Sequence, residues 1–276
     1  MRVINAEKIR DLIADACIKA NTVLPSDVLA ALKKAYALEK TALSRKLVEA
    51  IIENAGVAKK KGLAICQDTG LPALFVEIGQ DVKINGNLEQ ALQKGVEQGY
   101  RKGYFRDSIV KDPLSRGRSG FTPAVIHYEI KPGDKLKIVV LPKGFGCENK
   151  SALKMFNPTA DIKQIKDFVV EIVKKAGPDA CPPYVIGVGI GGTAEFACLL
   201  AKKALLNKVT GHRSLVTKLE EKILNEINKL NIGVMGLGGK TTAIGVNILT
   251  YPTHIAGLPV AVSISCHALR RASIII

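Results

Sequence analysis

Residues 184–207 read YVIGVGIGGTAEFACLLAKKALLN, and this stretch indicates the fold class. The segment Tyr184–Val188 is rich in β-branched residues and predicts a strand. Glycines continue to Gly192, and the residues from about Thr193 to Asn207 predict a helix. A strand that leads through a glycine loop into a helix is a repeating unit of α/β proteins, so we expect a fold of this class.

The rest of the second half of the chain continues the same alternation. A strongly amphipathic helix is predicted at Asp161–Ala176, with Gly177-Pro178 as its end. The spacing of apolar residues predicts another helix at Leu215–Leu230. Two apolar runs, Ala243–Leu249 and Pro259–Ser265, predict strands near the C-terminal end.

The first half combines a helical beginning with a sheet. Residues 1–60 are predicted to be helical, followed by a strand at Ala73–Ile78 and a helix near Leu88–Tyr100. Ala124–Ile130 and Leu136–Leu141 are predicted as strands that pair with each other around a Pro-Gly turn. We therefore expect a mixed α/β (α+β) fold, in which residues 1–276 form one domain and residues 1–60 are its helical N-terminal part.

The composition indicates a cytoplasmic protein. The chain has 276 residues, and its N-terminal residues do not have the pattern of a signal peptide. No apolar run is long enough to cross a bilayer, so we expect no membrane association. Six cysteines without a secretory signal indicate reduced thiols that serve as metal ligands or as buried residues.

The formal net charge of +15 has two interpretations. Such a charge is typical of nucleic-acid binding, and residues 103–122 are basic and are predicted to be irregular. However, aromatic residues make up only 5% of the chain and are not interleaved with basic ones, so we expect no nucleic-acid partner. The other interpretations are a solvated surface, an acidic partner chain, or a small anionic substrate attracted by the field.

Three of the cysteines are predicted to lie in loops, next to residues that interrupt regular structure: Cys66, Cys181 and Cys266. Three thiolates would hold an iron–sulfur cluster and leave one iron open as a Lewis acid, with Asp68 near the first cysteine. Spacing alone leaves open that they are unrelated structural thiols. Cys17 and Cys198 fall within helices and are predicted to be buried.

Residues Gly187–Gly192 contain the spacing G-x-G-x-x-G between a predicted strand and a predicted helix. Dinucleotide-binding loops have this context, but the acidic residue expected about twenty positions later is absent. Glycine amides at the beginning of a helix would still favour an anion.

His254 follows Tyr-Pro-Thr in a predicted loop between two strands. A histidine in this position is suited to general acid catalysis or to contact with a carboxylate. The alternative is an ordinary loop histidine held by a hydrogen bond.

Four motifs follow one another along the chain: Ile-Cys66-Gln-Asp-Thr-Gly70, Lys143-Gly-x-Gly-x-Glu148-Asn149, Cys181-Pro-Pro-x-x-x-Gly-Val-Gly-Ile-Gly-Gly-Thr193 and Pro-Val-Ala-Val-Ser-x-x-Cys266-x-Ala-Leu-Arg270. Together, and in this order, they resemble the α subunit of class I iron–sulfur fumarate hydratase, a family that includes the L(+)-tartrate dehydratase α subunit. The resemblance extends over almost the whole chain.

The resemblance implies a [4Fe–4S] cluster bound by Cys66, Cys181 and Cys266. The fourth iron, without a protein ligand, would coordinate the hydroxyl group and a carboxylate oxygen of a small dicarboxylate substrate. Cys147, in the glycine loop, replaces a serine of the family and is not expected to be a ligand.

The resemblance also implies a set of substrate-facing residues. Gln67 and Asp68 would face the substrate, with Asp68 as a candidate for proton transfer. Arg106 matches a carboxylate-binding arginine, and Gly144 would offer a backbone amide to the same ligand. His254 matches an active-site histidine. Phe145 departs from the family's glycine loop and leaves the identity of the substrate open.

The resemblance further implies a partner. Fused members of the family continue into a second domain, whereas this sequence ends at Ile276. We therefore expect a separate β subunit, in an α2β2 heterotetramer, and a homodimer of α that has little activity by itself.

The function expected from these observations is the reversible hydration of fumarate to (S)-malate. Dehydration of L(+)-tartrate is an alternative within the same class of enzyme. A nucleotide-binding or nucleic-acid-binding module that uses Gly187–Gly192 is the alternative from another class.

Overall fold

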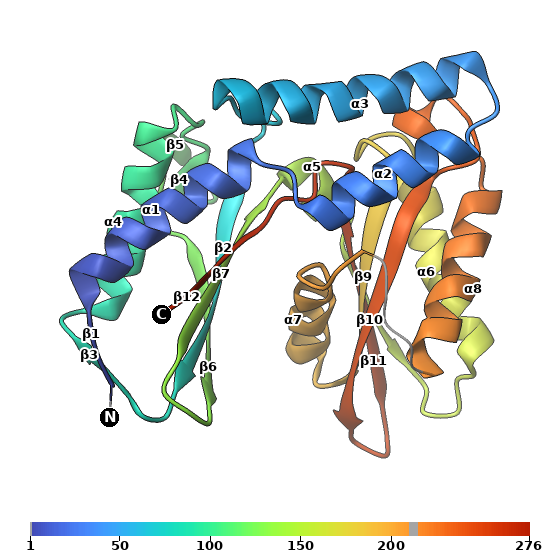
Figure 1. Cartoon of the computed structure of the whole chain (residues 1–276). Coiled ribbons are helices and arrows are strands. Elements are labelled where there is room, and N and C mark those ends of the chain that lie inside the picture. Colours follow the sequence, from blue (N-terminus) through green and yellow to red (C-terminus); the bar gives the residue numbers. More distant parts are fainter. Residues whose placement is uncertain (1, 210–214) are drawn as a thin grey trace. The chain divides into compact units, whose positions relative to one another are not determined.

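A computed structural model describes residues 2–209 and 215–276 of the chain (Figure 1). The chain forms two compact units. Unit 1 comprises Met1–Pro25, Ala55–Phe145 and Arg270–Ile276, and unit 2 comprises Ser26–Asn54 and Gly146–Leu269. Each unit combines helices with a mixed sheet, which confirms the predicted fold class. That residues 1–276 act as one domain stays a prediction.

The N-terminal region is helical, as predicted, apart from a short strand at its beginning. The strand is β1 (Arg2–Asn5), and it pairs in parallel with β3 (Val82–Asn85). The helices are α1 (Ala6–Thr22), α2 (Ser26–Leu38) and α3 (Ala42–Lys61). Helix α1 belongs to unit 1 and α2 to unit 2, and α3 begins in unit 2 and ends in unit 1.

Unit 1 is built on a four-stranded sheet with the order β12-β7-β2-β6. Its strands are β2 (Leu71–Gly79), β6 (Val125–Lys131), β7 (Leu136–Lys143) and β12 (Ala272–Ile275). Helix α4 (Leu88–Lys102) packs closely on α1, because a Cβ atom on Gly95 or Gly99 would lie 2.6 Å from a carbonyl oxygen of α1. Apolar residues of these helices and of the sheet form one buried core.

The prediction that the two strands around the Pro-Gly turn pair with each other is wrong. Strand β2 lies between them, parallel to β6 and antiparallel to β7. A turn sequence reverses the direction of the chain but does not make its two strands neighbours. Residues 72–76 of β2 are buried, and this strand takes the central position that a buried strand needs.

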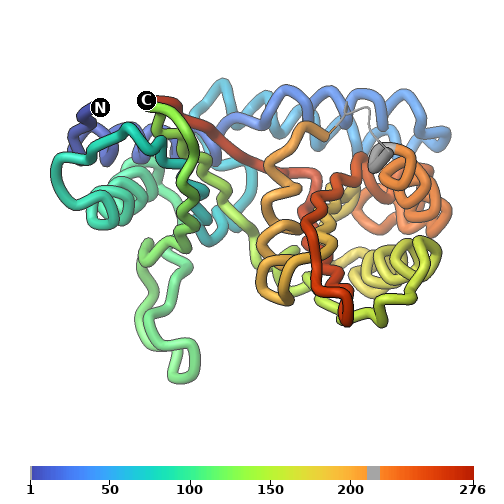
Figure 2. The backbone as a smooth tube through the Cα atoms, turned by 90° about the horizontal axis from the view of Figure 1, so that it is seen from below, coloured from blue at the N-terminus to red at the C-terminus, as the bar shows by residue number. Residues whose placement is uncertain are grey.

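Residues 103–122 are more regular than predicted. Strands β4 (Ile109–Asp112) and β5 (Arg116–Gly120) form an antiparallel hairpin, which projects from the rest of unit 1 in Figure 2. The turn is held by the side chain of Asp112, whose Oδ1 accepts hydrogen bonds from the amides of Leu114 and Ser115. An aspartate that binds the backbone two and three residues ahead is a local turn signal.

Unit 2 contains a sheet with the order β10-β9-β11-β8. Its strands are β8 (Ala152–Phe156), β9 (Tyr184–Gly192), β10 (Ala243–Thr253) and β11 (Leu258–Ser265). Helix α7 (Ala194–Ala204) packs on β9 and β11. Helices α6 (Ile162–Ala176) and α8 (Leu215–Lys229) lie beside the same sheet (Figure 1). Their apolar side chains share a buried core with those of the strands.

Helix α6 begins and ends where the sequence predicts. Asp161 and Gln164 form a reciprocal capping box, and Gly177 follows the last turn with a φ of 54°. No helix of the described residues is both long enough and apolar enough to cross a membrane.

The glycines of the G-x-G-x-x-G motif lie inside strand β9, not in a loop after it. A Cβ atom on Gly187 would lie 2.1 Å from the carbonyl oxygen of Ala201, and one on Gly189 would lie 2.1 Å from that of Ala197. These glycines therefore let helix α7 pack directly on the strand. The prediction of a glycine loop after the strand is therefore wrong. This arrangement also speaks against the dinucleotide-binding alternative, because a loop that binds a dinucleotide must leave its glycine amides open to the ligand.

Candidate functional site

Cys66, Gln67 and Asp68 lie in the loop of unit 1 that joins α3 to β2. The Sγ of Cys66 donates to the Oε1 of Gln67 at 3.6 Å. The loop ends at Gly70, which has a φ of 73°. A Cβ atom there would lie 2.8 Å from backbone atoms of Pro142 and Lys143, so only glycine fits where the loop passes the end of β7.

The carboxylate of Asp68 lies against the turn that follows β7. Its Oδ2 accepts a hydrogen bond from the amide of Phe145 at 2.9 Å, and its Oδ1 accepts one from Gly70 at 2.9 Å. A Cβ atom on Gly144 would lie 3.1 Å from the same Oδ2. The structure therefore brings together two predicted site residues, Asp68 and Gly144, that are far apart in the sequence.

Arg106 is tied to the same loop through its backbone. Its amide donates to the Oγ1 of Thr69 at 3.1 Å, and Thr69 is the neighbour of Asp68. Arg106 follows α4 and precedes the β4–β5 hairpin. Unit 1 thus gathers a carboxylate, a glycine turn and the backbone of an arginine around the loop that carries Cys66.

Cys181 and Cys266 lie next to each other in the fold of unit 2, at the same end of the two inner strands of its sheet. Cys181 precedes β9 and Cys266 follows β11, and these strands are antiparallel, with Val185 opposite Ser265. The Nδ1 of His267 lies 3.0 Å from the carbonyl oxygen of Cys181, so the two loops are in contact. Cys181 has a φ of 56°, and its amide donates to the carbonyl of Pro178.

The described residues contain no group of three or more His, Cys, Asp or Glu side chains that could hold a single metal ion. The predicted thiols are divided, with Cys66 in unit 1 and Cys181 and Cys266 in unit 2. Thiolates are the usual ligands of iron–sulfur clusters, in which each iron takes its own cysteine. Cys181 and Cys266, on loops that are in contact, thus offer two thiols of the kind that such a cluster takes as ligands.

His254 lies at the opposite end of the strands of the same sheet. It belongs to the turn between β10 and β11, and its Nδ1 accepts a hydrogen bond from the amide of Ala256 at 3.1 Å. The eight residues of β11 separate this turn from Cys266. At about 3.3 Å per residue, the strand spans roughly 26 Å. The structure therefore does not bring His254 together with Cys266 of its own chain.

A family model described as fumarate hydratase (Fumerase) matches residues 10–275. The chain belongs to the fumarate hydratase family. The members of this family are hydro-lyases, and this finding confirms the family predicted from the four motifs.

Relatives of this fumarate hydratase family member are named as α subunits. A protein of Methanocaldococcus jannaschii named "Putative L(+)-tartrate dehydratase subunit alpha" is 40% identical over 275 residues, which cover 96% of each chain. A protein of Escherichia coli O157:H7 named "L(+)-tartrate dehydratase subunit alpha" is 29% identical over 275 residues, covering 98% of this chain and 91% of the relative.

Two side chains near the cysteine loops, Cys147 and His267, were not predicted as site residues. Cys147 is buried, and its Sγ donates to the carbonyl of Ala180, the residue before Cys181. His267 joins the loops of Cys181 and Cys266. The position of His267 next to Cys266 in the sequence could have indicated that it lies near the site. The contact of Cys147 with Ala180 depends on the tertiary structure and has no such signal.

The two helix cysteines of the family member differ from each other. Cys17 is fully buried, as predicted, and burial raises the pKa of its thiol to about 12. Cys198 is exposed, so the prediction that it is buried is wrong. Helix α7 packs on the sheet through Ala197 and Ala201, and this register turns the neighbouring Cys198 outward.

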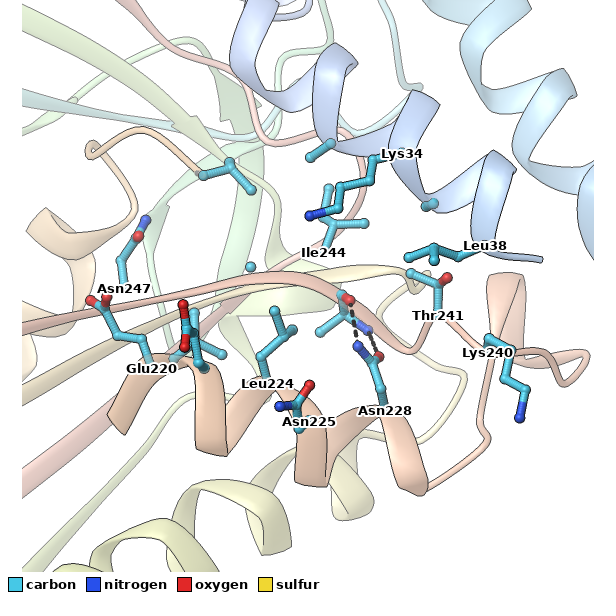
Figure 3. A pocket seen from close by; sticks show the side chains of 17 residues that line it. Lys34, Leu38, Glu220, Leu224, Asn225, Asn228, Lys240, Thr241, Ile244 and Asn247 are labelled. Carbon is cyan, nitrogen blue, oxygen red and sulfur yellow. Dashed lines mark hydrogen bonds between the residues drawn. The ribbon is translucent and has the colours of Figure 1, made fainter. Parts of the chain in front are cut away.

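A cavity of about 370 Å³ in unit 2 lies apart from every predicted site residue of this family member (Figure 3). It lies among α2, α8 and β10, and its lining includes Lys34, Leu38, Leu224 and Ile244. Two of its polar side chains accept hydrogen bonds from the backbone. Asn228 accepts from the amides of Thr242 and Ala243, and Glu220 accepts from the amide of Ile248. None of the predicted site residues lines this cavity.

Proposed function

We propose that this chain is the α subunit of an iron–sulfur hydro-lyase that reversibly hydrates fumarate to (S)-malate. Its membership of the fumarate hydratase family carries the proposal. The contact of Asp68 with the Gly144–Phe145 turn supports it, because two of the proposed substrate-facing residues meet there. We further propose that residues 1–276 act together as one catalytic domain.

The reaction needs no oxidant or reductant. A hydroxide equivalent from water adds to one alkene carbon of fumarate, and a proton adds to the neighbouring carbon. In the reverse direction the same proton and hydroxyl group leave as water. A group that binds the hydroxyl and a group that holds the proton are therefore the two essential parts of the site.

The residues of unit 1 suit a dicarboxylate. In the proposal, Arg106 and the amide of Gly144 bind carboxylate oxygens of the substrate, Gln67 contacts the substrate, and Asp68 holds the transferred proton. A formal net charge of +15 creates a field that favours approach of a dianion. Backbone amides and guanidinium groups both stabilise negative charge that develops on a substrate.

The proposed cofactor is a [4Fe–4S] cluster held by Cys66, Cys181 and Cys266. When bound, such a cluster would supply a Lewis acid at the iron that has no protein ligand. The donor chemistry of Cys181 and Cys266, on adjoining loops of unit 2, supports this assignment. The remaining ligand, Cys66, is the neighbour of Gln67 and Asp68, so the cluster and the substrate-facing residues would share one loop.

Dehydration of L(+)-tartrate is a second candidate, because both relatives described above are named for that reaction. The product of this dehydration is an enol that tautomerises to oxaloacetate, again without an oxidant. Tartrate carries one hydroxyl group more than malate. Phe145, which is half exposed beside Gly144, is the residue that we propose discriminates between these substrates.

We also propose a separate β subunit as a partner, because the relatives are named as α subunits. The proposed assembly is an α2β2 heterotetramer, built on a homodimer of α, in the cytoplasm. Neither nucleic acid nor a membrane has a role in the proposal.

The test is anaerobic co-expression with a candidate β chain, followed by assays with fumarate, malate and both enantiomers of tartrate. A brown protein that loses its broad visible absorbance in air and hydrates fumarate supports the proposal. Activity with L(+)-tartrate alone would select the second candidate. A colourless protein that retains NAD or elutes with nucleic acid would reject both candidates in favour of a binding module.

A further inference from the structure

Two buried side chains bind three consecutive backbone carbonyls in the loop of unit 1. The Nη2 of Arg270 donates to the carbonyl of Asp68 at 2.6 Å. The hydroxyl of Tyr100 donates to the carbonyls of Thr69 at 2.8 Å and Gly70 at 3.2 Å. We call Arg270 and Tyr100 the loop clamp.

The clamp comes from elements that are far from the loop in the sequence. Tyr100 lies near the end of α4 and is 1% exposed. The ring of Phe105 packs edge-on against it at 5.4 Å between centroids, which fixes the direction of its hydroxyl. Burial raises the pKa of Tyr100 above its ordinary value, so its hydroxyl remains a donor at neutral pH.

Arg270 is 3% exposed, which is unusual for a charged side chain. Its Nε and Nη1 have no hydrogen-bond partner among the described residues. A buried guanidinium group with unused donors costs stability, and an apolar side chain of similar size would avoid that cost. The single bond to Asp68 therefore does not account for the stability cost of burying Arg270. A buried polar group of this kind calls for an explanation, and a functional role is one.

The clamp acts on the residues that the proposed site uses. The carboxylate of Asp68 binds the amides of Gly70 and Phe145, while its carbonyl binds Arg270. The loop is therefore fixed both by the side chain of Asp68 and by its backbone. Arg270 also lies four residues after Cys266 in the sequence, so one short segment carries a proposed cluster ligand and a holder of the Cys66 loop.

We propose that Arg270 and Tyr100 are positioning residues, which hold Cys66, Gln67 and Asp68 in the geometry that the hydro-lyase reaction requires. This inference rests on the proposed function for its catalytic consequence, but not for the clamp itself. Sites whose reacting groups are fixed in advance lose rate when a supporting residue moves them by a small distance.

The clamp is tested first without cofactor, by hydrogen–deuterium exchange on the purified chain. In Tyr100→Phe and Arg270→Met, the amides of Gly70 and Phe145, which donate to the side chain of Asp68, should exchange at least about tenfold faster than in the wild type, whereas those of β7 should not change. Arg45→Met is the matched control, because the Nε of Arg45 also donates to a backbone carbonyl, that of Glu39 in unit 2. Unchanged exchange at Gly70 and Phe145, or faster exchange throughout unit 1, would overturn the proposal.

The catalytic consequence is tested with the assembled α and β chains. We expect kcat to fall by at least about tenfold in Tyr100→Phe and Arg270→Met, with a much smaller change in KM. Arg270→Lys keeps the charge and one donor, so it should recover part of kcat. Full activity in both clamp variants would overturn the positioning role. A wild-type pair without hydro-lyase activity would reject the proposed function, and the exchange experiment would still decide whether the clamp exists.

Discussion

The carboxylate of Asp68 and the amide of Phe145 are 77 residues apart in the sequence and 2.9 Å apart in unit 1. The other carboxylate oxygen of Asp68 binds the amide of Gly70. One side chain thus connects the loop that carries Cys66 to the glycine turn after β7. This arrangement makes Asp68 both a structural link and the proposed holder of the transferred proton.

Asp68→Asn should reduce kcat at least about 100-fold, because general acid–base residues contribute about 10² to 10⁴ in rate. It should also destabilise unit 1 by about 1–3 kcal/mol, since the new amide group would face a backbone donor. Steady-state assays and thermal unfolding measure the two effects. Asp112→Asn is the control, because Asp112 also binds two backbone amides, but in the turn of the hairpin. Near-normal kcat in Asp68→Asn would remove Asp68 from the proton-transfer role.

Cys181→Ser and Cys198→Ser should differ in iron content. The first removes a proposed ligand, whereas the second changes an exposed thiol on α7. Under anaerobic purification, we expect Cys181→Ser to retain less than about half of the wild-type iron and Cys198→Ser to retain nearly all of it. Iron analysis and visible absorbance provide the measurement. Equal iron loss in both variants would contradict our assignment of the ligands.

If the active site contains Cys266, as proposed, we expect a catalytic role of His254 to require a second copy of the chain. Since roughly 26 Å of β11 separates it from Cys266 of its own chain, His254 would have to act at the site of a neighbouring α subunit. His254→Gln and Cys181→Ser should then each be inactive. Their co-expression should restore about a quarter of the wild-type activity, because half of the dimers are mixed and each mixed dimer has one intact site. Mixed dimers without activity would exclude this arrangement.

Glu39 should make unit 2 sensitive to acid. Its side chain is 1% exposed and accepts hydrogen bonds from the amides of Lys240 and Thr241. Burial opposes ionisation, but these hydrogen bonds outweigh it and hold the pKa of Glu39 below its ordinary value of 4.5. The contribution of a carboxylate with a lowered pKa is present above the unfolded pKa and is lost as the pH falls through the folded pKa.

Chemical unfolding between pH 7 and pH 3 tests this expectation. The wild type should lose stability as the pH falls below about 4.5, whereas Glu39→Gln should start less stable and lose less over the same range. Glu129→Gln, on the exposed part of β6, is the control and should follow the wild type. Parallel curves for the wild type and Glu39→Gln would show that another group causes the acid sensitivity.

The sequence by itself determined the fold class, the positions of most helices and strands, and the family. Local signals are sufficient for these features: the apolar face and capping box of α6 fix its ends, and four ordered motifs identify the family. The sequence also predicted Asp68 and Gly144 as site residues, although it did not predict their contact.

Only the tertiary structure decided how these elements combine. Strand β2 separates β6 from β7, and the glycines of β9 pack on α7, because burial of a central strand and of a helix face outweighs turn and loop signals. Packing likewise decided that Cys198 faces outward and that His254 lies the length of β11 away from Cys266. It also brought Arg270 and Tyr100 to the loop that contains Asp68. Long-range contacts depend on sheet order and helix register, which local residue patterns do not encode.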